Sequence, residues 1–460
     1  MATLRFERPR GIPLLYLQST LETGADGLIT SLSGIRGILN SDLSLADVSR
    51  FATNFGMTTG SKEFLLARDS RSTGPAISKA VAAGIVSLGS TVLDYGIIST
   101  PALFRESRTK HLPAVMVTAS HNEPQFNGLK FIVDGAGIGK ETFDAVIGAL
   151  RENRGEFGRG SIRAAPRPAY VDDLVARFGA GSCDGVRVAV DLGGGAAISH
   201  TVPLLRRLGC EVTSMNDSYG VFNRKVDPVA DDLALLRKIV KAKGCDVGLG
   251  FDCDGDRLVI VDSSGRKRTG DFMLTLALSE MLAESGEKRV VVSLDTTQAV
   301  DDVAKSIGGY VYRSRVGEAN VVGLMKEKGA RLGGEGSSGG LIDGAFNYCR
   351  DSMLAALAII RALKTDGTKF YESVPVYHQE RVALEIPRVK AEKAIRKLAK
   401  EYDGADLTDG FKLTFPNKSW VLTRPSGTED VVRVSAEART SDKAAQLAKT
   451  FARKLKELSR

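Results

Sequence analysis

The stretch VGLGFDCDGDRLVIV at residues 247–261 consists of an apolar run, an acidic loop and a second apolar run. The run at 247–251 has the length and composition of a buried strand, and the loop after it carries Asp252, Asp254 and Asp256 at alternate positions. Three carboxylates this close repel one another unless a divalent cation holds them. Because Mg²⁺ takes oxygen ligands but few carboxylates, a phosphate oxygen is the natural further ligand. The stretch therefore predicts a strand that ends in a magnesium loop.

Other interpretations of this loop are weaker. An acidic turn without a metal is the structural alternative. Phosphatases that phosphorylate the first Asp of a DxD pair need a hydroxyl residue where Asp256 stands, and a helix–loop–helix calcium loop needs a Glu near its end, where this chain has Ser263. We therefore favour three metal ligands over one nucleophile and one acid.

Outward from this loop, residues 60–365 alternate short apolar runs with helix-length segments, which indicates strand and crossover-helix units. One cycle begins at the run 64–67, a second at 186–190, and a third contains 258–261, a helix at 271–285 and the run 290–292. The last ninety residues instead predict a strand at 381–386, one helix, three more strands and a final amphipathic helix. The expected fold is three successive α/β domains with mixed sheets plus a smaller C-terminal α+β domain. The expected domain boundaries are 1–165, 166–265, 266–372 and 373–460.

Composition narrows the functional classes. The 460 residues are 43% hydrophobic and 26% charged, which excludes a small module and a disordered chain. A net charge of +8 favours anionic partners, either phosphorylated metabolites or nucleic acid, but 6% aromatics are too few for a base-stacking platform. The five cysteines form no CxxC pair, which favours a reducing compartment. No apolar run reaches 18 residues and the first residues lack a hydrophobic segment, so we expect a cytoplasmic protein without a membrane anchor.

A second loop follows the strand-like run 114–117 and reads TASHN at residues 118–122. A Ser at the carboxyl end of a strand is where α/β sheets place reactive groups. Ser120 and His121 resemble hydrolase machinery, but adjacent side chains diverge and no GxSxG motif is present. A phosphoryl-carrying Ser120 is the sharper hypothesis, and a plain turn is the alternative.

Two further loops complete the set. Residues 333–340, GGEGSSGG, offer one carboxylate and two hydroxyls for sugar hydroxyls, with a ligand-free Gly-rich loop as the alternative. Residues 424–429, RPSGTE, together with Arg433 offer two guanidinium groups and two hydroxyls for a non-reacting phosphate, with a hairpin turn as the alternative.

These four loops occur once each and in order, and with them the chain resembles the α-D-phosphohexomutase family over residues 30–440, in the manner of its archaeal-type members. The resemblance rests on residues 118–122, NGLK at 127–130, DCDGDR at 252–257, GE at 334–335 and RPSGTE at 424–429. It implies a heart-shaped four-domain fold around a central cleft. It also implies a phosphoserine that converts a phosphorylated hexose into a hexose 1,6-bisphosphate, which turns over and returns its other phosphoryl group.

The resemblance also implies residue roles. One Mg²⁺ per chain would lie on Asp252, Asp254, Asp256 and an oxygen on Ser120. Arg257 would support the phosphoserine, Lys130 is a proton-transfer candidate, and Arg36 would lie beside the reacting Ser. The expected catalytic residues are Ser120, His121, Lys130, Arg36 and Arg257. The expected substrate-binding residues are Glu335, Ser337, Ser338, Arg424, Ser426, Gly427, Thr428 and Arg433.

Some features depart from the family pattern. Many bacterial members end the sugar loop in Ser-Gly-His, whereas Gly339 and Gly340 close it here. The loop is one residue longer than usual, so either Ser337 or Ser338 could contact the sugar. About thirty residues precede Ser33, for which a surface arm is the default interpretation.

The functional hypotheses follow from these residues. The first is a phosphohexomutase. Its phosphate-binding residues 426–428, here called the cradle, resemble those of phosphoglucosamine mutases, which favours that activity over a phosphomannomutase/phosphoglucomutase. The second is a phosphosugar-binding relative without catalysis, against which the intact Ser120, Asp triplet and Lys130 argue. We expect no nucleic-acid or membrane partner, and the sequence does not decide between a monomer and a homo-oligomer.

Overall fold

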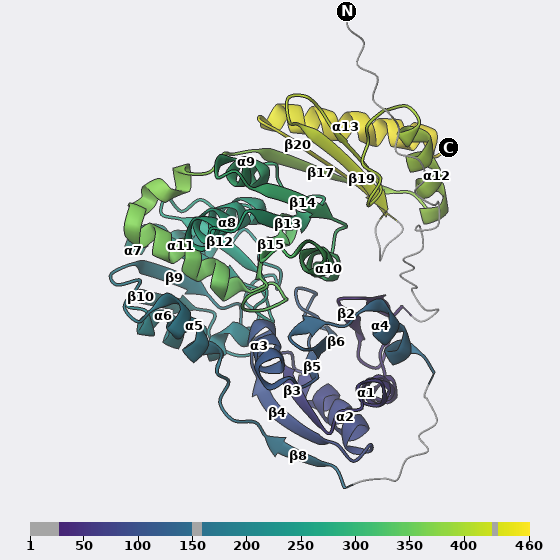
Figure 1. The fold of residues 1–460 in the computed structure, drawn as a ribbon, viewed down its shortest axis with the longest axis vertical. Helices are drawn as coiled ribbons and strands as arrows, with labels where there is room; N and C mark the ends of the chain where they lie inside the picture. Colours follow the sequence, from purple (N-terminus) through teal and green to yellow (C-terminus); the bar gives the residue numbers. More distant parts are fainter. Residues whose placement is uncertain (1–26, 150–158, 426–430) are drawn as a thin grey trace, which may run out of the picture.

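The computed structural model describes residues 27–149, 159–425 and 431–460 and arranges them in four units, domains I to IV, each with its own sheet (Figure 1). In Figure 1 domain I is purple and blue at the bottom, and domain IV is yellow-green at the top. The predicted fold class, three α/β domains with mixed sheets and a C-terminal α+β domain, is confirmed. The exact domain boundaries stay predictions.

Domain I has a mixed sheet of strand order β1-β2-β6-β5-β3-β4-β8, with β7 paired to β6. Its strands are β1 (Ile29–Ser31), β2 (Gly34–Ile38), β3 (Glu63–Arg68), β4 (Thr91–Ile97), β5 (Ala114–Val117), β6 (Phe126–Val133), β7 (Ala136–Gly137) and β8 (Ser161–Ala164). Its helices are α1 (Leu45–Thr59), α2 (Gly74–Val86), α3 (Thr100–Lys110) and α4 (Lys140–Ile147). Successive side chains of β3 enter opposite cores, because a strand points alternate residues to opposite faces of the sheet. The fully apolar run predicted at 64–67 therefore reflects burial on both faces.

Domains II and III repeat one arrangement, three parallel strands with an antiparallel strand at one edge. Domain II contains α5 (Tyr170–Phe178), β9 (Arg187–Asp191), α6 (Thr201–Arg207), β10 (Glu211–Met215), α7 (Ala234–Lys243), β11 (Val247–Phe251) and β12 (Leu258–Asp262). Domain III contains α8 (Gly270–Ser285), β13 (Arg289–Ser293), α9 (Ala299–Ser306), β14 (Tyr310–Ser314), α10 (Glu318–Lys328), β15 (Leu332–Glu335), β16 (Gly340–Asp343) and α11 (Ser352–Asp366). The placement of the run 258–261 in the third cycle was wrong, because β12 pairs antiparallel with β11 and closes the second sheet.

One continuous apolar core joins domains I, II and III. It contains side chains of β3 and α3, of β9 and β11, and of α8 and α11. Helices α8 and α11 are apolar on nearly all sides, as expected of helices enclosed by other elements. Shared packing of this kind fixes the three domains relative to one another.

Domain IV is an antiparallel sheet of order β17-β20-β19-β18 with its own core. It contains β17 (His378–Glu385), α12 (Arg388–Ala399), β18 (Phe411–Thr414), β19 (Trp420–Pro425), β20 (Val431–Ala438) and α13 (Ser441–Leu458). The predicted order of one strand, one helix, three strands and a final helix is confirmed. Domain IV has its own core and meets domain III through a small apolar contact of Leu294 with Trp420 and Leu422.

The strand that leads into the acidic loop provides a stability test. Replacing Leu249, which is 0% exposed in the middle of β11, by Ala should lower the free energy of unfolding by about 2–5 kcal/mol, because a cavity remains. Leu235, which is 50% exposed on α7, is the matched control and should change stability by less than about 0.5 kcal/mol when replaced by Ala. Urea unfolding followed by circular dichroism measures both, and equal losses would contradict the burial of Leu249.

Candidate active site

Ser120 lies in the loop after β5 and is fully buried, with its hydroxyl aimed at domain II. Its Oγ donates to Asp252 Oδ2 at 3.0 Å. Its backbone adopts φ 53°, a left-handed conformation that costs a non-Gly residue free energy and persists only where the surroundings impose it. Thr118 helps to impose it, because its Oγ1 accepts the Ser120 N–H at 2.8 Å and donates to Asp69 Oδ2 at 2.6 Å.

Arg71 holds the rest of this loop, and sequence reasoning missed it. Its fully buried guanidinium pairs with Asp69 at 3.0 Å and donates to the carbonyl oxygens of Ser120 at 2.6 Å, Asn122 at 2.7 Å and Phe126 at 2.9 Å. A signal was present, because charged residues directly follow the apolar strand β3. Arg71 therefore fixes the backbone that presents the Ser120 hydroxyl.

The acidic loop between β11 and β12 gathers its carboxylates as predicted. Asp252, Asp254 and Asp256 are buried, and ligand oxygens of all three lie within 4.8 Å of one another. Burial and the two neighbouring carboxylates raise the pKa of Asp252 well above its ordinary value. Asp254 Oδ1 and Asp256 Oδ1 are buried without a hydrogen-bond partner. Buried carboxylate oxygens without donors fit an oxygen-ligated divalent cation such as Mg²⁺, which would also relieve the mutual repulsion.

Two residues of domain I reach into the same loop. Lys130, on β6, donates from Nζ to Asp254 Oδ2 at 2.7 Å and to Asp256 Oδ2 at 2.9 Å. Burial alone would lower the pKa of Lys130, but these two carboxylates outweigh it and raise the pKa above its ordinary value. Thr100, at the start of α3, donates to Asp254 Oδ2 at 2.6 Å. Domain I thus helps to hold the acidic loop of domain II.

Arg36 and Arg257, which were predicted to lie near Ser120, contact the two residues that follow it. Arg36 donates to Asn122 Oδ1 at 3.0 Å, and Arg257 Nη2 lies 3.5 Å from His121 Nε2. Burial and the charge of Arg257 lower the pKa of Arg36 to about 10. Burial, Arg257 and Arg36 hold the pKa of His121 well below its ordinary value, so the imidazole is neutral. Closely spaced cations of this kind suit a bound phosphate, whose charge would offset their repulsion.

Glu335 is the last residue of β15 in domain III and is buried. Its Oε1 accepts the Gly317 N–H at 2.7 Å, and burial raises its pKa, an effect that Arg350 offsets in part. Ser338 Oγ lies 3.1 Å from Arg350 Nη1. Ser337 turns to Asp295, whose pKa is lowered by Arg381 and by hydrogen bonds that include one from Ser337, against the effect of burial. The two Ser residues of the predicted sugar loop therefore have different partners.

Arg350 connects the sugar loop to the acidic loop and was also missed by sequence reasoning. Its guanidinium donates to Asp256 Oδ2 at 2.9 Å and lies 3.5 Å from Glu335 Oε2 and 3.1 Å from Glu318 Oε2. The sugar loop ends in Gly340 because a Cβ there would lie 2.2 Å from Arg350 Cδ. Arg350 lies in the segment between β16 and α11, where no local pattern marks it, so only the fold reveals its contacts.

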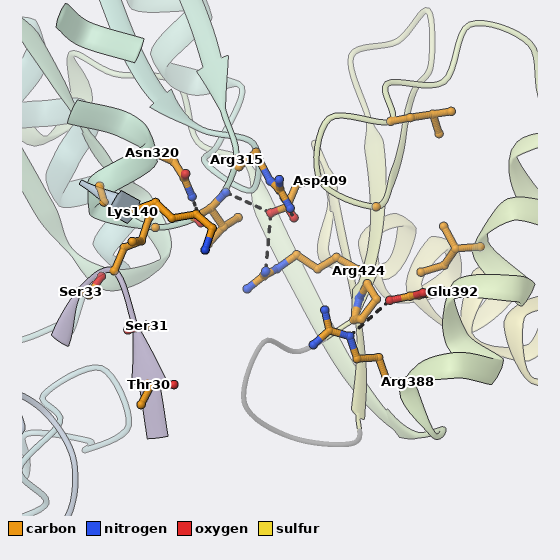
Figure 2. A pocket seen from close by; sticks show the side chains of 18 of the residues that line it. Thr30, Ser31, Ser33, Lys140, Arg315, Asn320, Arg388, Glu392, Asp409 and Arg424 are labelled. Atoms are coloured by element: carbon orange, nitrogen blue, oxygen red, sulfur yellow. Dashed lines mark hydrogen bonds and ion pairs between the residues drawn. The ribbon is translucent and has the colours of Figure 1, made fainter. Parts of the chain in front are cut away.

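Arg424 and Arg433 lie opposite each other on β19 and β20 of domain IV. The predicted ligands Ser426, Gly427 and Thr428 fall outside the described residues. A pocket of about 600 Å³ adjoins Arg424 and is lined by domains I, III and IV (Figure 2). Arg315 of domain III and Arg388 of α12 also line this pocket and were not predicted.

Within the described ranges, the structure contains no helix with the length and apolar character needed to span a membrane.

Comparison with known proteins agrees with this geometry. Four consecutive family models match: phosphoglucomutase/phosphomannomutase α/β/α domain I at residues 28–156, domain II at 168–265, domain III at 269–379 and the C-terminal domain at 381–454. A probable phosphoglucosamine mutase of Methanopyrus kandleri is 32% identical over 435 residues, 91% of this chain and 96% of that protein. A phosphoglucomutase/phosphomannomutase of Thermococcus kodakarensis is 33% identical over 449 residues, 91% of this chain and 96% of that protein.

A crystal structure of a phosphoglucomutase/phosphomannomutase family protein from Burkholderia thailandensis superposes with a TM-score of 0.80 at 26% identity, covering 93% of this chain and 96% of that one. The order of the four domains, the buried Asp triplet beside Ser120 and these matches agree, and they confirm the resemblance drawn from the motifs. The chain belongs to the phosphoglucomutase/phosphomannomutase family of phosphohexomutases.

Proposed function

We propose that this chain interconverts hexose 6-phosphate and hexose 1-phosphate through a phosphoserine at Ser120 and a bound hexose 1,6-bisphosphate, with glucosamine phosphate as its natural substrate. The observation that carries the proposal is the hydrogen bond of the buried Ser120 hydroxyl to Asp252, one of the three carboxylates of the acidic triplet. The choice of sugar is supported by the relative named a probable phosphoglucosamine mutase and by the sequence of the cradle at 426–428. A phosphomannomutase/phosphoglucomutase activity is the alternative, supported by the relative of that name.

The reaction is a reversible exchange of a phosphoryl group. The bond from Ser120 Oγ to phosphorus breaks as one forms from a sugar hydroxyl oxygen, and the sugar's proton is transferred so that Ser120 becomes a free hydroxyl. After the bisphosphate has turned over, Ser120 Oγ bonds to its other phosphorus as the bond from that phosphorus to the sugar oxygen breaks. The Ser120 proton passes to that sugar oxygen, which regenerates the phosphoserine and releases the product. Positioning and charge stabilisation dominate such transfers, because little covalent work is required of the protein.

The residues divide this work. Asp252, Asp254, Asp256 and the oxygen on Ser120 would hold one Mg²⁺, which would neutralise charge on the transferring phosphoryl. Arg36 and Arg257 would face the same phosphoryl. Lys130, whose Nζ donates to Asp254 and Asp256, would be the proton-transfer residue, as the family resemblance implies. Neutral His121 would pack beside the reacting group.

Substrate recognition uses the other two domains. Glu335 with Ser338 or Ser337 would hold sugar hydroxyls in either orientation of the ring. Arg424, Arg433 and residues 426–428 would bind whichever phosphate is not reacting, through charge-assisted hydrogen bonds.

The phosphoserine can be tested by mass. Incubation with glucose 1,6-bisphosphate should add one phosphoryl group to the intact protein, and Ser120→Ala should remove both this addition and mutase turnover, by at least about 10⁴-fold. Ser279→Ala, which removes a hydroxyl bonded to a helix carbonyl on α8, is the control and should behave like wild type. Phosphate that persists on Ser120→Ala would overturn the phosphoserine.

The metal loop can be tested by metal removal. EDTA should abolish turnover and Mg²⁺ should restore it, while Asp254→Asn should weaken Mn²⁺ binding by at least about tenfold in titration calorimetry, because a charged ligand is lost. The control is Asp232→Asn, whose side chain bonds the Ala234 N–H at the start of α7. Activity that survives EDTA would contradict the metal assignment.

The choice of sugar can be tested by direct comparison. Glucosamine, mannose and glucose 6-phosphates should be assayed side by side with Mg²⁺ and a bisphosphate primer. The highest kcat/KM is expected for glucosamine 6-phosphate, and a higher value for either other sugar would favour the alternative activity.

A further inference from the structure

A carboxylate of domain IV lies between two Arg residues in the wall of the 600 Å³ pocket. Asp409 Oδ2 is 3.6 Å from Arg424 Nη1 of its own domain, and Asp409 Oδ1 is 3.9 Å from Arg315 Nε of domain III. Asp409 Oδ2 also accepts the Val316 N–H at 3.0 Å. Figure 2 shows Asp409 beside Arg315, with Arg424 below it and joined to it by a dashed line.

The backbone keeps this carboxylate in place. Gly410, the next residue, has φ +95°, and a Cβ there would lie 2.3 Å from the Thr423 carbonyl oxygen and 2.9 Å from Arg424 Cβ. The segment therefore packs directly on the strand that carries Arg424, and Asp409 cannot retreat from it. With 14% of its side chain exposed, Asp409 is a partly desolvated anion beside Arg424.

Besides its contact with Asp409, Arg424 is proposed to bind a phosphate. Under the proposed function, on which this inference rests, Arg424 binds the non-reacting phosphate of the substrate. A phosphate and the Asp409 carboxylate are both anions that accept guanidinium N–H groups, and each reduces the attraction of Arg424 for the other. Asp409 is thus placed to compete with the phosphate for the Arg424 guanidinium.

We propose that Asp409 is a positioning residue that competes with the non-reacting phosphate for Arg424. The bisphosphate must leave the cradle before it turns over, and its departure would leave Arg424 without an anion. Asp409 supplies a replacement partner within its own domain, so release of the phosphate costs less. The Asp409 contact therefore lowers the affinity of the site for the phosphate and raises the rate at which the bisphosphate reorients.

This competition predicts the sign of a charge-removing substitution. Asp409→Asn keeps an acceptor for the Val316 N–H but removes the negative charge. In a Ser120→Ala background, which prevents turnover, it should tighten glucose 1-phosphate binding by about fivefold, the size expected for a partly exposed ion pair. In the active enzyme kcat and KM should both fall, because the bisphosphate is held longer. Asp409→Glu keeps the charge and should bind close to wild type.

A purely structural role predicts the opposite. If Asp409 only orders Arg424 and Arg315, Asp409→Asn would weaken glucose 1-phosphate binding and raise KM, and that result overturns the proposal, as does an unchanged affinity. Thermal unfolding confirms that each variant is folded. Asp409→Ser is the second charge-removing variant should the Asn variant fail to fold.

Asp302 provides the matched control. It lies on α9 of domain III with 17% of its side chain exposed and pairs with Lys418 at 2.5 Å and Arg439 at 3.3 Å of domain IV, away from the residues that line the pocket. Asp302→Asn loosens the same domain contact without touching Arg424, so its glucose 1-phosphate affinity should equal wild type. Tightening in both variants would assign the effect to domain mobility and overturn the proposal. Absence of glucose 1-phosphate binding in the parent protein would instead count against the proposed function.

Discussion

The hydrogen bond from Ser120 Oγ to Asp252 Oδ2 joins the Ser120 loop of domain I to the acidic loop of domain II. It brings a hydroxyl to three buried carboxylates, an arrangement that is unfavourable without compensating positive charge. The chain supplies that charge from several domains at once, because Lys130 comes from β6 and Arg350 from the segment after β16. These groups come from different domains, and the shared core of domains I to III holds them at fixed separations.

Domain IV does not share the core of the other three domains. Its core is separate, and polar contacts and a small apolar cluster connect it to domain III. One such contact, the Asp409 carboxylate with Val316 and Arg315, lies in the pocket wall. The proposed reactive centre therefore lies in the part of the molecule that shares one core, while the proposed phosphate cradle lies on a domain with a smaller attachment. Under the proposed function, the bisphosphate reorients between two transfers. This suits a fixed reactive centre combined with a phosphate-binding site that can release its ligand.

Local patterns revealed the parts of the molecule that depend on local chemistry. The apolar run 247–251 and its three carboxylates predicted β11 and the acidic loop, and the stripe on the last helix predicted α13. The run 258–261 was misassigned because apolar residues alone do not tell which sheet a strand joins. Arg71, Arg350 and Asp409 were missed because each acts on residues far away in the chain or in another domain.

Crystals soaked in Mn²⁺ test the central claim most directly, since anomalous scattering locates the ion without reference to activity. The account predicts one peak within about 2.0–2.4 Å of oxygens from Asp252, Asp254 and Asp256, with an oxygen on Ser120 as a further ligand. An ion bound elsewhere, or a triplet that stays paired with Lys130 and takes up no Mn²⁺, would contradict it.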